Sequence, residues 1–411
     1  MIQGLWHQLG RGTETLVRDL LQGGVGEGGI LSPIDLDFRQ ALGTALGFRQ
    51  AGKGVLWDPQ FYDPPLINSR SAGYPTHAFR RSVEELAVLD SAGQDALTKA
   101  LHEINRSLGS SAVIAPAVQY EAGSPRIWGI NQMLFRCAKR AGDQLGVPTM
   151  ASIPVGSSVS VSDSETSSIL SAATALPSDG WYFLFDFDRD LVPMNPGRLT
   201  RCAAACLALA GTEKPVVFGF SGLMSLPVLA WGVTAVGFGH AGALHQFRGR
   251  HFNLRVRQQQ AADRRNGRAG GGPESVRFFS PGLWAGVACP DETSPIALFP
   301  ELHDRVLVPS PYSQRVIDDP TTSEWTLDEA HMHYIWHIER QVKGLLAEPT
   351  LSRRAHQVQA LLGTQIGLWE ILNQRGIAIR QGFHLGYWPV WKDVVRDALR
   401  EKAVEYEWLE G

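Results

Sequence analysis

Short apolar runs and amphipathic stretches alternate along most of this chain. Each apolar run is bounded by glycine or proline and leads through a polar tip into a stretch with apolar residues at helical spacing. The apolar runs cover residues 29–36, 55–60, 112–120, 148–156, 181–188, 215–222 and 234–239. The helical stretches cover residues 37–50, 83–108, 125–145, 165–175, 196–210 and 223–231. This pattern predicts parallel strands that are buried on both faces and joined by helical crossovers.

Seven strands are visible, and we expect an eighth either before residue 29 or at residues 276–279. The pattern therefore favours an α/β fold of the TIM type, a (β/α)8 barrel, in which functional groups gather at the C-terminal ends of the strands. A doubly wound open sheet is the alternative. It is less favoured because no strand leads into a Gly-rich dinucleotide turn and the repeat never reverses its spacing.

The length of 411 residues suits one barrel of about 250 residues with an appendage. We expect the barrel in residues 1–300 and a helical C-terminal subdomain in residues 301–411, which shows helical spacing at 327–346, 351–373 and 391–408. This subdomain could dock on the barrel, or it could pair subunits into a homodimer or a larger complex.

The composition of the chain indicates its cellular location. No apolar run is long enough to span a bilayer, and the N-terminus lacks a charged start followed by an apolar stretch, so we expect a cytoplasmic protein without membrane contact. The four cysteines show no disulfide framework. Cys202 and Cys206 lie one helical turn apart, which fits packing on one helix face better than zinc binding. We expect neither a metal nor a cofactor.

The tip of the strand at residues 55–60 carries the most suggestive chemistry. Asp58 and Gln60 supply a carboxylate and an amide, and aromatic side chains flank them. Aromatic rings can stack on a planar heteroaromatic ligand while polar groups bind its hydrogen-bonding edge, as in base-binding pockets. Alternatively, Asp58 caps a turn before a proline and the aromatics belong to the core. The flanking aromatic residues are Trp57, Phe61 and Tyr62.

Other strand tips carry further candidates. Alternation sends Asp186 and Asp188 to one face of their strand, and two carboxylates in a barrel mouth are costly without a catalytic role or an arginine partner. Tyr120 and Glu121 end another strand as candidate base-binding residues. His240 follows two glycines that allow a close backbone approach, although a lone histidine is more often structural.

Residues 248–272 form a positive, Gly-terminated segment in a chain whose net charge is only −3. A solvated loop is the ordinary interpretation of a charge run. Seven arginines with a single acid, Asp263, beside glutamine and asparagine, fit contact with phosphate equally well. The arginines are Arg248, Arg250, Arg255, Arg257, Arg264, Arg265 and Arg268.

In this order, the tips resemble the tRNA-guanine transglycosylases and their DNA-modifying relatives, which exchange guanine for a 7-deazaguanine base. The run VLWDPQF is similar to the strand that carries that family's first aspartate, and this places Asp58 on it. QYEAGSP resembles the family's acidic turn, with Glu121 as the acid. Residues 130–146 and 214–232 resemble two of its helical and strand motifs, and the arginine-rich segment falls where the family meets nucleic acid.

The chain also departs from this family. At residues 237–240, where the family has its nucleophilic aspartate, there is no carboxylate. Residues 307–312 lack the zinc cysteines, which leaves His331 and His333 without their usual soft co-ligands. Base exchange needs a nucleophile or a well-protected cation, so Asp58, Asp186 or Asp188 would have to take that part.

Three functions follow as expectations. The first is a transglycosylase-like enzyme that exchanges or cleaves a purine or 7-deazapurine base in DNA or tRNA. The second is an inactive relative that binds nucleic acid as the scaffold subunit of a larger complex. The third is a TIM-barrel enzyme for a small phosphorylated substrate, bound by backbone amides at residues 219–222 and 237–242. The sequence leaves open the choice of DNA or RNA, the base and the oligomeric state.

Overall fold

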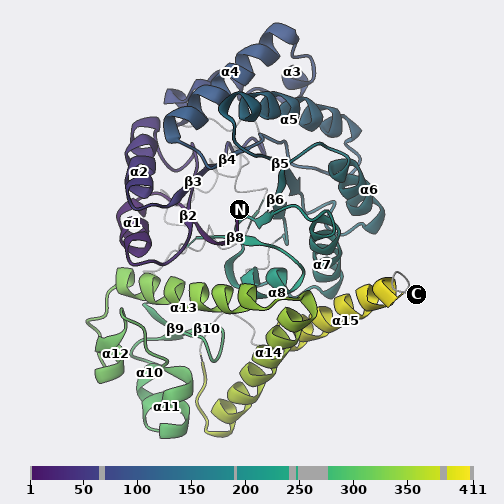
Figure 1. The fold of residues 1–411 in the computed structure, drawn as a ribbon. Coiled ribbons are helices and arrows are strands. Elements are labelled where there is room, and N and C mark those ends of the chain that lie inside the picture. Colours follow the sequence, from purple (N-terminus) through teal and green to yellow (C-terminus); the bar gives the residue numbers. More distant parts are fainter. Residues whose placement is uncertain are drawn as a thin grey trace, which may run out of the picture. The chain divides into compact units, whose positions relative to one another are not determined.

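Eight parallel strands close into a barrel in the order β1 to β8 (Figure 1). The structure, a computed structural model, describes residues 2–63, 70–188, 192–239, 247–248, 276–379 and 387–407, without the side chains of residues 399 and 401–407. β1 pairs in parallel with both β2 and β8, which confirms the TIM-type barrel and excludes the open sheet. The strands are β1 (Gly4–Gln8), β2 (Gly28–Leu31), β3 (Gly54–Trp57), β4 (Ala112–Ile114), β5 (Thr149–Val155), β6 (Gly180–Phe185), β7 (Val216–Phe218) and β8 (Ala235–Phe238).

The eighth strand is the one before residue 29. The other candidate, residues 276–279, lies in β9 (Arg277–Ser280), which pairs antiparallel with β10 (Ala285–Ala288) in a separate two-stranded sheet. β1 has the sequence GLWHQ, and all five of its residues are buried. Because His7 and Gln8 are polar, the hydrophobic pattern does not mark this segment as a strand, although both side chains are buried.

The predicted helices are present with one change. The expected helix at residues 83–108 is two helices, α3 (Val83–Ala87) and α4 (Ser91–Leu108). Asp90 caps the N-terminus of α4, because its side chain accepts a hydrogen bond from the Gly93 backbone N–H at 2.8 Å. Helices α1, α2, α4, α5 and α6 lie outside the strands (Figure 1). In the first part of the chain the helices are α1 (Glu14–Gln22), α2 (Phe38–Gln50), α3 (Val83–Ala87), α4 (Ser91–Leu108), α5 (Pro125–Leu145), α6 (Asp163–Thr174), α7 (Pro196–Ala210) and α8 (Ser225–Ala230).

The C-terminal region is helical, as expected. Among the described residues, no helix combines the length and the apolar character that a membrane span requires. The helices of this region are α10 (Thr293–Ala297), α11 (Pro300–Val306), α12 (Gln314–Asp318), α13 (Leu327–Ala347), α14 (Leu351–Gln374) and α15 (Tyr387–Glu407).

The chain forms two compact units, each built from several segments. The barrel unit comprises Met1–Arg189, Ala204–Gly222 and Gly232–Gly270, and the helical unit comprises Asp190–Ala203, Leu223–Trp231 and Gly271–Gly411. The expected boundary at residue 300 stays a prediction. All side chains of the candidate site described below belong to the barrel unit.

The side chain of Trp6 on β1 accounts for the presence of glycine at two positions in the neighbouring strands. A Cβ added at Gly28 would lie 2.6 Å from the Trp6 ring, and one added at Gly54 would lie 2.4 Å from it. The indole therefore fills the interior at the start of these strands, where a side chain on either residue would clash. Trp6 belongs to the buried interior cluster, together with Ile30, Leu56, Ile114, Met150, Tyr182, Leu184, Val217 and Ala235.

Candidate functional site

A buried polar layer lies inside the barrel near the C-terminal ends of three strands. Gln8 is the last residue of β1, Asp58 directly follows β3, and Tyr182 lies in β6. Side chains two residues apart share a face of a strand, so Asp58 points inward like Leu56 and Gln8 points inward like Trp6. Gln8, Asp58 and Tyr182 are all fully buried. The strand pattern thus converts three polar residues distant in sequence into one interior cluster.

Three donors bind the Asp58 carboxylate. The Tyr62 hydroxyl donates to Oδ1 at 2.7 Å, and the Gln60 backbone N–H donates to the same oxygen at 2.9 Å. From across the barrel, the Tyr182 hydroxyl donates to Oδ2 at 3.1 Å. A buried carboxylate with this many donors is held in one orientation, with both oxygens engaged.

Burial shifts the acidity of this carboxylate. The pKa of Asp58 is raised from 3.8 to about 6, because desolvation disfavours the charged form by more than the hydrogen bonds and the Arg80 charge favour it. Desolvation also raises the pKa of Tyr62 and of Tyr182 well above the ordinary value, so both hydroxyls stay protonated as donors. A carboxyl with a pKa near neutrality can take up or release a proton under physiological conditions.

The turn after β3 is held in an uncommon conformation. Gln60 has φ 50°, a region that non-glycine residues rarely adopt. Arg80 holds this turn: its guanidinium donates to the Pro59 carbonyl oxygen and, at 3.3 Å, to that of Gln60, and it lies 5.0 Å from the centre of the Phe61 ring. Burial lowers the pKa of Arg80 to about 10, so the guanidinium remains charged at neutral pH. Strain of this kind is often found at functional sites.

Two glutamine side chains beside Asp58 have buried atoms without hydrogen-bond partners. Gln8 Oε1 lies 3.3 Å from the Tyr182 hydroxyl, whose single proton it shares with Asp58 Oδ2, and Gln8 Nε2 has no partner among the described residues. Gln60 Oε1 is also buried and unpartnered within the described part of the chain. An unpaired buried donor or acceptor costs about 1–3 kcal/mol, which a ligand's polar edge would recover. One buried donor, on Gln8, and one buried acceptor, on Gln60, are therefore unpaired within the described part of the chain.

Aromatic rings cover this polar layer. Phe247 packs edge-on against Tyr62 with ring centres 5.2 Å apart, and it lies 6.1 Å from Phe220. Phe247 is 1% exposed. The layer around Asp58 thus combines hydrogen-bonding groups with aromatic surface, as a site for a planar ring requires.

Glycines at the ends of β7 and β8 make room for the polar layer. A Cβ on Gly219 would lie 2.7 Å from the Tyr182 hydroxyl, and one on Gly237 would lie 3.2 Å from Gln8 Oε1. These glycines were expected to present backbone amides to a phosphate. The Gly219 amide donates instead to the Phe183 carbonyl oxygen at 3.0 Å, and phosphate binding by the other amides of these segments stays a prediction.

Asp186 and Asp188 differ from the expected pair. Strand β6 ends at Phe185 and Asp188 has φ 67°, so the alternation that was to place both carboxylates on one face does not continue to Asp188. Asp186 is 4% exposed, and its Oδ1 accepts from the Asp188 backbone N–H at 2.7 Å. No hydrogen bond joins Asp58 to either residue within the described ranges. The structure thus places both near the end of β6 without pairing them with Asp58.

Glu121 lies in a second polar cluster. Its carboxylate oxygens accept from Gln119 Nε2 and Ser158 Oγ, and its side chain is exposed. Tyr120 is buried and stacks on Trp128 at 6.3 Å. The two clusters share no side-chain hydrogen bond among the described residues. Their loops are nevertheless joined, because the Gln119 backbone N–H donates to the Tyr62 carbonyl oxygen at 3.1 Å.

Trp57 and Phe61 lie away from the carboxylate. Trp57 has the opposite alternation from Leu56, and its ring stacks on Tyr74 with centres 6.1 Å apart. Phe61 is fully buried beside the Arg80 guanidinium. Of the predicted aromatic contacts, Tyr62 is therefore the one that reaches Asp58.

Several predicted residues lie outside the described part of the chain. Arg248 is described and is 8% exposed. The proposed contacts of the remaining arginines with nucleic acid, and the proposed role of His240, stay predictions. The residues outside are His240, Arg250, Arg255, Arg257, Arg264, Arg265 and Arg268.

The histidines of α13 are bound by protein atoms. His333 Nδ1 lies 2.8 Å from Ser310 Oγ and its Nε2 lies 2.8 Å from the Phe279 carbonyl oxygen, while His337 Nε2 lies 3.2 Å from the Val308 carbonyl oxygen. Across the described ranges, no group of three or more histidine, cysteine, aspartate or glutamate side chains could hold a metal ion.

Comparison with known proteins adds no assignment: no family model and no curated protein matches this chain.

Sequence reasoning missed four residues around Asp58. Gln8 lies in β1, which the sequence pattern did not assign. Tyr182 lies within an apolar run, so we expected it to be an ordinary core residue. Arg80 enters from a loop, and Phe220 follows β7 with φ 55°. A usable signal existed for the first two: each is a polar residue at an interior position of a strand, Gln8 at the end of β1 and Tyr182 within β6.

Proposed function

We propose that the barrel binds a purine or 7-deazapurine base of a nucleic acid and cleaves or exchanges it, with Asp58 as the acid–base residue. The observation that carries this proposal is the buried Asp58 carboxyl, with its pKa raised to about 6, together with a buried unpaired amide donor on Gln8 and a buried unpaired carbonyl acceptor on Gln60. Such a set of groups can complement the polar edge of a purine. The sequence resemblance to the tRNA-guanine transglycosylases points to the same class of ligand.

The polar edge of guanine illustrates the fit. Its ring N–H and amino group can donate to the Asp58 carboxylate and to Gln60 Oε1, while its carbonyl oxygen can accept from Gln8 Nε2. Tyr62, with Phe247 against it, supplies aromatic surface next to this edge. Binding would thereby pair the two glutamine atoms that are otherwise unpartnered.

The acidity of Asp58 suits the chemistry of base release. A departing base leaves more readily when it receives a proton as the bond to the sugar breaks. A pKa of about 6 keeps some Asp58 protonated near neutral pH, and this form can give its proton to a carbonyl oxygen or ring nitrogen of the base. The ionised form that results is the one that accepts from the N–H groups of the base. The sugar then becomes cation-like, which a second carboxylate stabilises in sugar hydrolysis generally. Asp186 and Asp188 are the candidates for that part.

An inactive nucleic-acid-binding subunit is the second candidate, and one observation favours it. Strand β8 ends at Phe238 and is followed by Gly239, so no carboxylate follows it up to the last described residue there. Both oxygens of Asp58 are also already engaged by Tyr62, Tyr182 and the Gln60 N–H. In this second candidate, the barrel binds the base through the polar layer but does not catalyse cleavage or exchange.

Base incorporation separates the two candidates. The protein is incubated with DNA or tRNA and radiolabelled guanine or 7-deazaguanine, and the label in the precipitated nucleic acid is counted. We expect incorporation by the natural protein and a loss of rate of about 10²–10⁴-fold in Asp58→Asn, with nucleic-acid binding retained. Asp143→Asn is the matched control, because Asp143 is an exposed carboxylate that pairs with Lys139 at 2.7 Å.

Other results would decide against the enzyme. Nucleic acid that binds with a steep salt dependence, without incorporation of either base, would favour the inactive subunit. A protein that binds neither base nor nucleic acid would contradict both candidates.

A further inference from the structure

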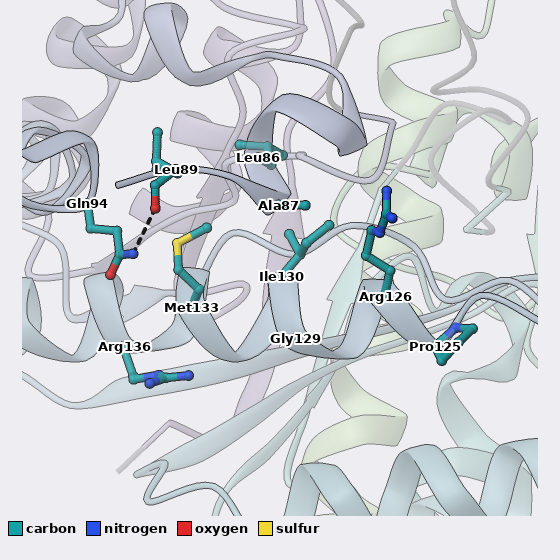
Figure 2. A pocket seen from close by; sticks show the side chains of 10 residues that line it. All are labelled: Leu86, Ala87, Leu89, Gln94, Pro125, Arg126, Gly129, Ile130, Met133 and Arg136. Atoms are coloured by element: carbon teal, nitrogen blue, oxygen red, sulfur yellow. Dashed lines mark hydrogen bonds between the residues drawn. The ribbon is translucent and has the colours of Figure 1, made fainter. Parts of the chain in front are cut away.

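A groove of ≈ 400 Å³ lies on the outside of the barrel unit, between α5 and the segment that joins α3 to α4. Figure 2 shows Ile130 and Met133 on α5 below Leu86 and Ala87, with Arg126 and Arg136 toward opposite ends. The groove is thus apolar in its middle and positive toward its ends. This arrangement is independent of the interior layer around Asp58.

A glycine in α5 keeps the groove open. Gly129 lines the groove inside the helix, and a Cβ built on it would meet nothing within 4 Å. Glycine inside a helix costs about 1 kcal/mol relative to alanine. Ile130 and Leu86 are buried under the groove, so the accessible apolar surface is that of the exposed Ala87 and the half-buried Leu89 and Met133. Val88, which adjoins two lining residues in sequence, is 79% exposed.

The two arginines of the groove are available for a partner. Both are exposed, and neither forms an ion pair with a described residue. Arg136 donates from Nε to the Gln132 carbonyl oxygen at 3.4 Å. The next basic residues on α5 differ, since Lys139 pairs with Asp143 at 2.7 Å and Arg140 pairs with Asp95 at 2.6 Å.

Glu84 offsets part of the charge at one end. Its pKa is lowered by backbone and Ser82 hydrogen bonds and, to a smaller extent, by the charge of Arg126. The Arg136 end keeps its full positive charge. A partner with acidic groups toward both ends would match the groove, with the stronger contact expected at Arg136.

We propose that this groove docks a short acidic amphipathic segment of a partner protein. Its apolar side chains would lie over Met133 and Ala87, and its carboxylates would contact Arg126 and Arg136. These arginines are about 15 Å apart along the axis of α5, a span that a helical segment of about ten residues covers. This is the helix-in-groove mode of recognition.

The lining favours a protein segment over a nucleic acid. Single-stranded nucleic acid is held by aromatic side chains on which bases stack, and none of the residues that line this groove is aromatic. A phosphate backbone would contact the arginines but would gain nothing from the apolar surface of Ala87, Leu89 and Met133.

Peptide selection tests this proposal without a known partner. Phage-displayed random peptides of about twelve residues are panned on the whole natural protein, and enriched peptides are labelled and titrated by fluorescence anisotropy. We expect enriched sequences that combine leucine, isoleucine or phenylalanine with aspartate or glutamate. Gly129→Leu, which fills the groove, should weaken binding more than about tenfold, and so should Arg126→Glu combined with Arg136→Glu.

The controls separate docking from folding. Gly129→Leu replaces a helical glycine in open space, so its melting temperature should equal or exceed that of the natural protein. Arg39→Glu reverses the charge of an exposed arginine on α2 and should leave peptide binding unchanged. Failure to enrich peptides, or binding that Gly129→Leu does not change, would overturn the proposal. Labelled single-stranded DNA that binds the natural protein and Gly129→Leu equally, but not the double arginine variant, would also overturn it.

Discussion

Two buried polar clusters in this protein differ in whether all of their polar atoms have hydrogen-bond partners. In the helical unit, both ring nitrogens of His333 have partners, Ser310 Oγ and the Phe279 carbonyl oxygen, each at 2.8 Å. In the barrel unit, the Asp58 carboxylate is fully hydrogen-bonded, but Gln8 Nε2 and Gln60 Oε1 beside it are buried without described partners. The first cluster is complete by itself, and the second is not.

The pKa values of His333 and Asp58 differ in the same way as their hydrogen bonding. Burial lowers the pKa of His333 to about 3, which keeps the ring neutral at any physiological pH. Burial raises the pKa of Asp58 to about 6, which leaves it close to the point where it gains or loses a proton. His333 is fixed in one protonation state, as a structural residue is, whereas Asp58 lies close to its point of protonation in an incomplete polar cluster, the arrangement on which our proposal of a binding or catalytic role rests.

Removing the histidine should have the largest effect on stability. His333→Ala leaves the Phe279 carbonyl oxygen and the Ser310 hydroxyl without this partner and opens a cavity, so we expect a loss of roughly 3 kcal/mol in the free energy of unfolding. Urea denaturation measures it. Base binding in the barrel unit should be unchanged in any His333→Ala protein that remains folded. A loss below about 0.5 kcal/mol would mean that the histidine is not structural.

The pH dependence of stability tests the Asp58 side of the comparison. The pKa of Asp58 is raised from 3.8 to about 6, so its stabilising contribution is complete below pH 3.8 and is lost as the pH rises through about 6. Asp58→Asn lacks this titration. The free energy of unfolding of the natural protein, relative to Asp58→Asn, should therefore fall by about 2 kcal/mol between about pH 4.5 and about pH 7.5. A constant difference across this range would contradict the raised pKa.

Gln8 offers the smallest and most selective effect. Gln8→Met removes the unpartnered donor while keeping the volume, at the loss of one long hydrogen bond from Tyr182, so stability should change by less than about 1 kcal/mol. Base binding should weaken about tenfold, since the ligand loses one hydrogen bond in a buried site. Equilibrium binding of labelled guanine measures this change. Unchanged affinity would show that Gln8 does not face the ligand.

The barrel was predictable from the sequence because buried parallel strands read as continuous apolar runs. β1 was left undecided since His7 and Gln8 interrupt its pattern, although His7 is buried and bonded to the Val25 carbonyl oxygen at 2.9 Å. Asp58 was predictable from its place directly after a strand. Its partner Tyr182 was not, because contacts across a barrel depend on closure and stagger, which a linear pattern does not contain.

The departures at β6 and β3 have a local origin. The expected pairing of Asp186 with Asp188 assumed that the strand continues, whereas the positive φ of Asp188 turns the chain. Trp57 and Tyr62 both looked like ligand contacts from their spacing. Alternation within β3 sends Trp57 to the outer face, and the turn held by Arg80 brings Tyr62 back to Asp58.

The most direct test of the central claim is equilibrium binding of free guanine and 7-deazaguanine to the whole protein at about pH 7.5, by isothermal titration calorimetry. Our account predicts that at least one of the bases binds the natural protein at a single site, that Asp58→Asn binds it more than about tenfold more weakly, and that Asp143→Asn binds it normally. Equal affinity in the natural protein and in Asp58→Asn, or no binding of either base to the natural protein, would contradict the claim that Asp58 forms a base-binding site.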